Sequence, residues 1–120
     1  MKEISPDGLI ATAKRETPVE GNVLHLKDEL FTNDALVWDE LESRCVHYGV
    51  PGKPGLDIAF PDTSMLGIWM KPGAHYLCIE PWAGIADPEG YAGDFRSKPG
   101  VFEVAPGTKR LFRVTVTVGE

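Results

Sequence analysis

Glycine and proline interrupt this chain so often that little room remains for long helices. The 120 residues include 13 glycines and 10 prolines, and these residues follow no regular period. Turn residues at this density divide a sequence into short segments, which is typical of all-β proteins. No long stretch has the hydrophobic period of a helix. The sequence therefore predicts a single all-β domain over residues 1–120, an antiparallel sandwich or barrel.

The expected strands are short apolar or alternating runs that end at turn residues. Lys71-Pro72-Gly73 has proline and glycine in the order of a type II turn, and Pro81 is expected to stop the strand that follows. In the last run, Val116 and Val118 fall on one face with the other apolar residues. The expected strands cover residues 35–38, 45–50, 56–60, 66–70, 75–80 and 111–118.

The composition and net charge of the chain argue against several classes of function. Hydrophobic residues make up 42% of the chain and charged residues 25%, as in ordinary globular proteins. The net charge is −6 without a basic run, which argues against nucleic-acid binding. No signal-peptide pattern or membrane-length apolar segment is visible, so we expect a cytoplasmic protein without membrane contact. Cys45 and Cys78 match no metal-binding spacing, and free buried thiols are expected.

One ordered set of motifs resembles a known family. Residues 66–82 read LGIWMKPGAHYLCIEPW, GIADP follows at 84–88, and LFTNDALVW precedes at 30–38. This set resembles the C-terminal part of the aldose 1-epimerase (galactose mutarotase-like) family. The resemblance covers roughly residues 22 to 118 in the same order. Together the motifs are specific, although each alone would be weak.

The resemblance implies a fold and a chemistry. The fold would be part of an antiparallel β-sandwich of the galactose mutarotase type, often called a supersandwich. The activity would be interconversion of the α and β anomers of an aldose, with no metal or organic cofactor. In the family a glutamate takes the proton of the C1 hydroxyl while a histidine protonates the ring oxygen, which is paired base and acid catalysis. Glu80 occupies the position of that base.

Three further residues are candidates for sugar binding. Asp34 matches an aspartate that hydrogen-bonds sugar hydroxyls in related epimerases, and a carboxylate can accept two hydroxyl donors. A turn or helix-capping aspartate is an equally open interpretation of Asp34. Trp82 would offer an apolar face to the sugar ring, although a strand tryptophan often belongs to a core. Lys71 would bond a sugar oxygen, with a solvated turn lysine as the competing interpretation.

The chain departs from the family pattern at the general acid. The family's acid histidine stands before a proline, whereas none of His25, His47 and His75 does. His75 is five residues from Glu80, which places the two on opposite faces of a regular strand. The chain therefore resembles a truncated member, a fragment, or a subunit that needs another chain. A partial sandwich exposes an apolar face, so we expect self-association, or else a missing N-terminal half.

Two other functions remain open at this level. A carbohydrate-binding module would keep Asp34, Glu80 and the aromatic residues without turnover. A small metal-binding barrel of the cupin kind is suggested faintly by the Pro72-Gly73 pair ahead of His75 and Glu80. That motif requires a second histidine two residues from the first, and the chain has none at either place.

Overall fold

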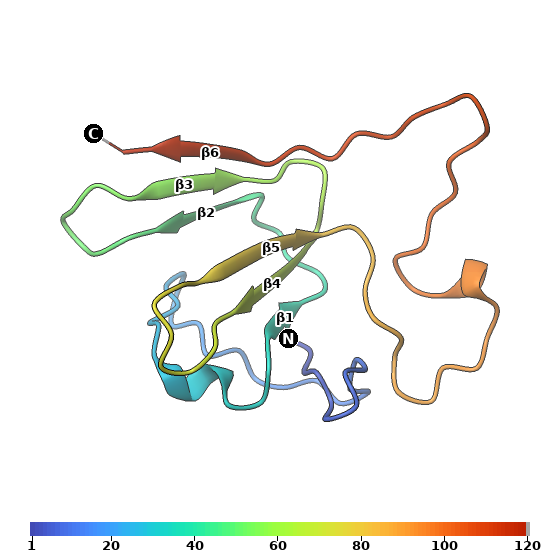
Figure 1. Ribbon diagram of the computed structural model, residues 1–120, viewed down its shortest axis with the longest axis horizontal. Coiled ribbons are helices and arrows are strands. Elements are labelled where there is room, and N and C mark those ends of the chain that lie inside the picture. The colour runs from blue at the N-terminus through green and yellow to red at the C-terminus, as the bar shows by residue number, and fades with distance from the viewer. Residues whose placement is uncertain (120) are drawn as a thin grey trace.

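The computed structural model describes residues 1–119 and shows an all-β fold of two small antiparallel sheets (Figure 1). Two short 3-10 helices, η1 (Asp28–Phe31) and η2 (Phe95–Ser97), complete its regular structure. The all-β prediction is confirmed at this level. The first sheet has the order β1 (Leu36–Trp38), β4 (Met65–Trp69), β5 (Cys78–Trp82), and the second the order β2 (Cys45–Tyr48), β3 (Leu56–Ala59), β6 (Thr115–Val118).

The turn between β4 and β5 has the geometry that the sequence predicts. The amide of Ala74 donates to the carbonyl of Lys71 at 2.9 Å, and Gly73 has a φ of 81°. A positive φ at the third position is the mark of a type II turn. The amide of Gly73 also donates to Asp28 Oδ2 at 3.0 Å, which ties the turn to η1.

Strand β5 differs from the prediction at both ends. It begins at Cys78 instead of residue 75, and it continues through Pro81 to Trp82. Pro81 lies opposite Leu66 in the register with β4. β5 is an edge strand, so its outer side forms no ladder bonds. Proline is tolerated there because its missing N–H is not needed on that side.

Strand β6 is half as long as predicted. Only residues 115–118 pair with β3, ending at the pair of Thr115 and Ala59. Beyond that pair the amide of Phe60 donates to the carbonyl of Arg44 at 2.8 Å, which continues the β2–β3 ladder, and the next residue, Pro61, has no N–H to donate towards β6. The amide of Arg113 instead donates to the side chain of Asp62 at 2.9 Å. The alternating pattern before Thr115 therefore has no strand to pair with.

One hydrophobic core joins the two sheets. Phe60 at the end of β3 and Leu36 of β1 are its most deeply buried members, with 0% and 1% of their surface exposed. Burial of such side chains stabilises each by roughly 1.5–3 kcal/mol relative to exposure. The buried cluster comprises Leu30, Phe31, Leu36, Ile58, Phe60, Leu66 and Ile68, which come from η1, β1, β3 and β4 and their ends.

The N-terminal segment runs from the edge of β1 to the loop after β5. The amide of Lys2 donates to the carbonyl of Val37 at 2.8 Å. Ile10 is buried, and its amide donates to the carbonyl of Asp87 at 2.9 Å. Its carbonyl accepts from the amide of Glu89 at 2.8 Å. Residues far apart in sequence are thereby brought to the first sheet.

The structure corrects one expectation about the cysteines. Both are free, but Cys45 is exposed on β2, whereas Cys78 is partly buried. Cys45 pairs with Ala59 on the outer face of the second sheet. The next residue, Val46, lies on the opposite face and packs against the core. The prediction of a buried thiol is therefore wrong for Cys45. Within residues 1–119 we find no helix that combines the length and apolar character needed to cross a bilayer.

Candidate functional site

Glu80 lies in the middle of β5, directly opposite Gly67 of β4. Gly67 in turn pairs with Val37 of β1, so these three residues form one row across the sheet. Alternate residues of a strand share a face, which places Trp82 on the same face as Glu80. A glycine at the centre of the row leaves space above the sheet next to the Glu80 carboxylate.

The indole of Trp82 occupies that space. A Cβ atom on Gly67 would lie only 2.7 Å from Cζ2 of Trp82, so the ring rests directly on the glycine backbone. From this position Trp82 Nε1 donates a hydrogen bond of 3.1 Å to Glu80 Oε2. The bond holds one carboxylate oxygen, and Oε1 is the atom left for another donor.

A surface depression of about 390 Å³ adjoins this pair. It includes three of the four residues that the sequence predicts for the site, namely Asp34, Glu80 and Trp82. They come from the connection before β1 and from β5, so the fold brings together residues that are 46 to 48 positions apart in the sequence. The complete lining is Ile4, Gly8, Asp34, Ala35, Trp69, Glu80 and Trp82.

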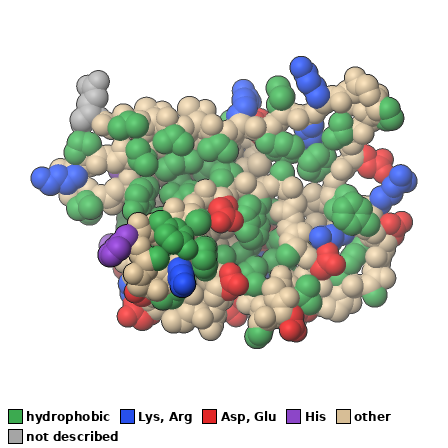
Figure 2. Space-filling view, viewed as in Figure 1, with side chains coloured by type: hydrophobic (Ala, Val, Ile, Leu, Met, Phe, Trp, Pro, Cys, Tyr) green, Lys and Arg blue, Asp and Glu red, His purple; other side chains and the backbone are tan. Residues whose placement is uncertain are grey.

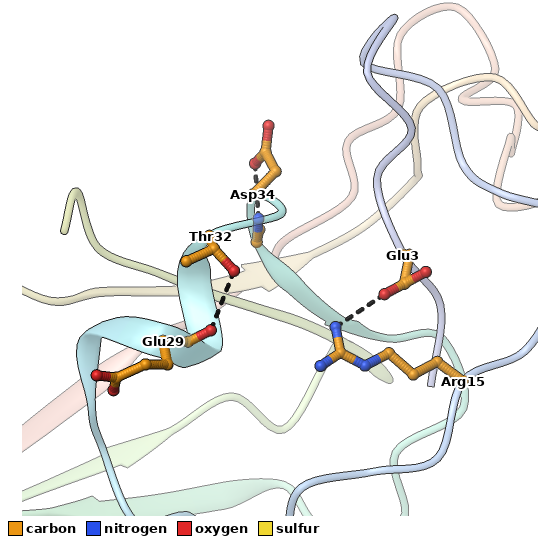
Figure 3. A network of polar contacts seen from close by, with 6 residues as sticks. Glu3, Arg15, Glu29, Thr32 and Asp34 are labelled. Atoms are coloured by element: carbon orange, nitrogen blue, oxygen red, sulfur yellow. Dashed lines mark hydrogen bonds and ion pairs between the residues drawn. The ribbon is translucent and has the colours of Figure 1, made fainter.

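Asp34 lies in the connection between η1 and β1. Its backbone has a φ of 72°, a left-handed conformation that aspartate tolerates better than most residues. Its Oδ1 accepts a hydrogen bond of 2.6 Å from the amide of Ala35, as Figure 3 shows. Just before it, the Thr32 hydroxyl donates to the carbonyl of Glu29 at 3.2 Å. Asp34 is therefore a turn residue, and it also lines the depression.

Lys71 lies apart from the other candidates. It is exposed in the β4–β5 turn and is not among the residues that line the depression. Tyr76, in the same connection, packs against Trp69 with 6.0 Å between ring centroids. Trp69 lines the depression, whereas Tyr76 and Lys71 do not.

The N-terminal residues of the lining were missed by sequence reasoning. Ile4 and Gly8 carry no local motif, and they join the site only because their segment folds back on the first sheet. An ion pair of 2.8 Å between Glu3 and Arg15 holds this segment (Figure 3). Ser5 adds a turn, since its carbonyl accepts from the amide of Gly8 at 2.9 Å. No sequence signal indicated these contacts.

Two carboxylates are the ionisable groups of the lining. The histidines lie elsewhere: His47 Nδ1 is 2.8 Å from Oδ1 of Asp57 on the second sheet, and His25 and His75 are exposed. Over residues 1–119 no group of three or more metal-binding side chains comes together. The chemistry available at the depression is proton acceptance and hydrogen bonding by Asp34 and Glu80, next to two indole rings.

The chain is similar to known bacterial proteins. The chain is 31% identical over 98 residues to two proteins of Lactococcus lactis subsp. lactis, "Protein LacX, plasmid" and "Protein LacX, chromosomal". The match covers 78% of this chain and 32% of each relative, so the chain spans about a third of their length. No family model matches the chain. No solved structure matches it either.

Proposed function

We propose that the depression at Glu80 binds a monosaccharide and that Glu80 is the general base of an aldose 1-epimerase-like reaction. The observation that carries this proposal is the convergence of Glu80, Asp34 and Trp82 on one depression. The motif resemblance points to Glu80 and Asp34, and Trp82 lines the same depression. Their proximity does not follow from their places in the sequence, since β2, β3 and β4 separate the connection before β1 from strand β5.

Glu80 would remove the proton of the sugar's C1 hydroxyl. Its Oε2 accepts from Trp82 Nε1, which leaves Oε1 to accept from the hydroxyl. As that proton moves to the carboxylate, the bond between C1 and the ring oxygen breaks and the ring oxygen takes a proton from a water molecule; both proton transfers are reversed when the ring closes. Rotation about the C1–C2 bond and reclosure then give the other anomer. A positioned base typically contributes about 10²–10⁴-fold to such a rate.

Asp34 and the indoles would hold the sugar. Oδ1 of Asp34 is engaged by the amide of Ala35, and we assign Oδ2 to a sugar hydroxyl. Trp69 and Trp82 line the same depression and offer apolar surface to the C–H face of the ring. This assignment makes Asp34 a binding group and Glu80 the proton acceptor.

A non-catalytic carbohydrate-binding protein is the second candidate. It is favoured by the lining itself, in which the ionisable groups are two carboxylates and the histidines lie elsewhere. Such a set can accept hydroxyl hydrogens but has no imidazole to protonate the ring oxygen. Binding without turnover would follow directly from this composition.

Polarimetry on freshly dissolved α-glucose and α-galactose tests the proposal. We expect the chain to accelerate the optical rotation change, and Glu80→Gln to remove most of that acceleration. Glu40→Gln, at an exposed glutamate outside the lining, is the matched control and should retain full activity. Activity that survives Glu80→Gln would contradict the assignment of the base. Sugar binding by calorimetry without any acceleration would favour the binding protein.

A further inference from the structure

The outer edge of β6 has a defined set of open backbone groups. β6 pairs with β3 on one side only, since the sheet order is β2-β3-β6. The amide of Gly119 donates to the carbonyl of Gly55 at 2.7 Å, which extends this ladder by one pair. Bonded pairs alternate along an antiparallel ladder, so Thr117 also bonds towards β3. The N–H and C=O groups of Val116 and Val118 therefore point to the open side.

This edge lacks the devices that usually protect an edge strand. Natural edge strands carry lysine, proline, bulges or inward-pointing charges that block further pairing. β6 reads Thr-Val-Thr-Val and contains none of these residues. The nearest preceding charge, Arg113, is held by both carboxylate oxygens of Asp62, each at 2.9 Å. The open edge is therefore uncharged along its length.

The side chains along this edge are apolar and exposed. Val116 and Val118 are 55% and 73% exposed, although they lie in register with Ile58 and Leu56, which face the core. Val114, just before the strand, is 56% exposed. Figure 2 shows hydrophobic side chains gathered over the sheet that contains β6. Val116 and Val118 therefore lie on the core-facing side of the sheet, but their side chains are exposed to solvent.

We propose that β6 is a self-association edge, which pairs antiparallel with β6 of a second copy around a two-fold axis. Only Val116 and Val118 have open backbone groups within the strand, and Val116 can form a bonded pair either with itself or with Val118 of the other copy. Both registers place valine against valine and threonine against threonine on matching faces. The two three-stranded sheets then join into one continuous sheet. The strand is complementary to itself, and this favours a second copy as the occupant.

Sedimentation velocity over a concentration series tests the proposal. We expect a monomer–dimer equilibrium that Val116→Lys and Val118→Lys each weaken by about 10-fold to 100-fold, because each places a lysine of either copy within the paired strands, where a charged edge residue blocks further pairing. Val23→Lys is the matched control: Val23 is 47% exposed in the N-terminal segment, and its substitution should leave the dimer unchanged. All four proteins should keep the same far-ultraviolet circular dichroism spectrum.

Amide hydrogen exchange gives a second readout that a misfolded variant cannot imitate. In the dimer the amides of Val116 and Val118 should exchange slowly, and in Val118→Lys the amide of Val116 should become fast. The amide of Thr117, which bonds β3, should stay protected in both proteins. If β6 instead accepts a strand from a different protein, the purified chain would sediment as a monomer at every concentration. That result would overturn the proposal, as would a dimer in which the Val116 amide remains fast.

Discussion

The side chains of Trp82 and Glu80 form a hydrogen bond of 3.1 Å on one face of β5, over a glycine of the neighbouring strand. The distance joins the indole nitrogen to Oε2 of the carboxylate. Gly67 makes this arrangement possible, since any side chain there would occupy the position of the indole ring. The orientation of the proposed base therefore depends on a residue that has no functional group.

Gly67→Ala should disturb both stability and the site. The added Cβ would lie 2.7 Å from the Trp82 ring, so the indole must move away from the strand and its bond to Glu80 must lengthen. Overpacking of this kind costs about 1–3 kcal/mol, which a urea titration of the variant would measure. Trp82→Phe is the companion variant because it keeps a ring but removes the donor. If Gly67→Ala has wild-type stability, the close packing described above is incorrect.

Glu80→Gln and Asp34→Asn should affect different kinetic parameters. If the chain is an epimerase, loss of the base should lower kcat by about 10²–10⁴-fold, because the amide cannot take up a proton. Asp34→Asn should raise KM with a smaller change in kcat, since its proposed role is hydrogen bonding in both ground and transition states. Polarimetry at several sugar concentrations separates the two parameters. The reverse pattern would exchange the two assignments.

The backbone at Asp34 predicts an order of stability among three variants. Its φ of 72° is favourable for glycine, tolerated by asparagine and unfavourable for alanine. We expect Asp34→Ala to be less stable than Asp34→Gly by about 1 kcal/mol, with Asp34→Asn close to the native chain. Thermal unfolding of the three proteins measures this order. Equal stability of the alanine and glycine variants would count against the left-handed backbone.

The ion pair of Asp62 and Arg113 predicts a contribution to stability that acid removes. The hydrogen bonds from the side chain of Arg113 lower the pKa of Asp62 below the ordinary value of 3.8. The hydrogen bond from the Arg113 amide and the positive charge of the guanidinium act in the same direction. Because the folded-state pKa is the lower one, the contribution is fully present above pH 3.8 and is lost as the pH falls through the lowered pKa. Asp62→Asn should therefore be less stable than the native chain at neutral pH.

Urea titrations across the acid range test this contribution. The difference in unfolding free energy between the native chain and Asp62→Asn should shrink as the pH falls below 3.8, where the native carboxyl also becomes neutral. Asp7→Asn, at an exposed aspartate, serves as the control and should show little difference at any pH. A difference for Asp62→Asn that is constant with pH would show that the pair contributes through packing alone.

Thr63 offers a stabilising substitution. Its side chain is buried, with 7% of its surface exposed, and Oγ1 has no hydrogen-bond partner among the described residues. A buried hydroxyl without a partner costs free energy, and valine has nearly the same shape without the polar atom. We expect Thr63→Val to raise the unfolding free energy by about 1 kcal/mol. Thr63→Ser, which keeps the hydroxyl and loses a methyl group, should lower it.

The fold class and several local elements followed from the sequence by itself. Frequent glycine and proline exclude long helices, and the alternation in residues 56–60 and 66–70 is a property of neighbouring residues that needs no distant partner. The Lys71–Ala74 turn is determined in the same way, because proline and glycine restrict the backbone locally. These features depend on interactions within a few positions of the chain.

The ends of the strands and the composition of the depression depend on long-range contacts. β6 begins at Thr115 because β3 provides partners only as far as Ala59, although the alternating pattern starts earlier. β5 passes through Pro81 because it lies at a sheet edge. The motif resemblance named Asp34 and Glu80, but their meeting with Ile4 depends on how the N-terminal segment folds back. Local patterns determine which segments become strands, whereas only tertiary packing decides which of them, and which side chains, become neighbours.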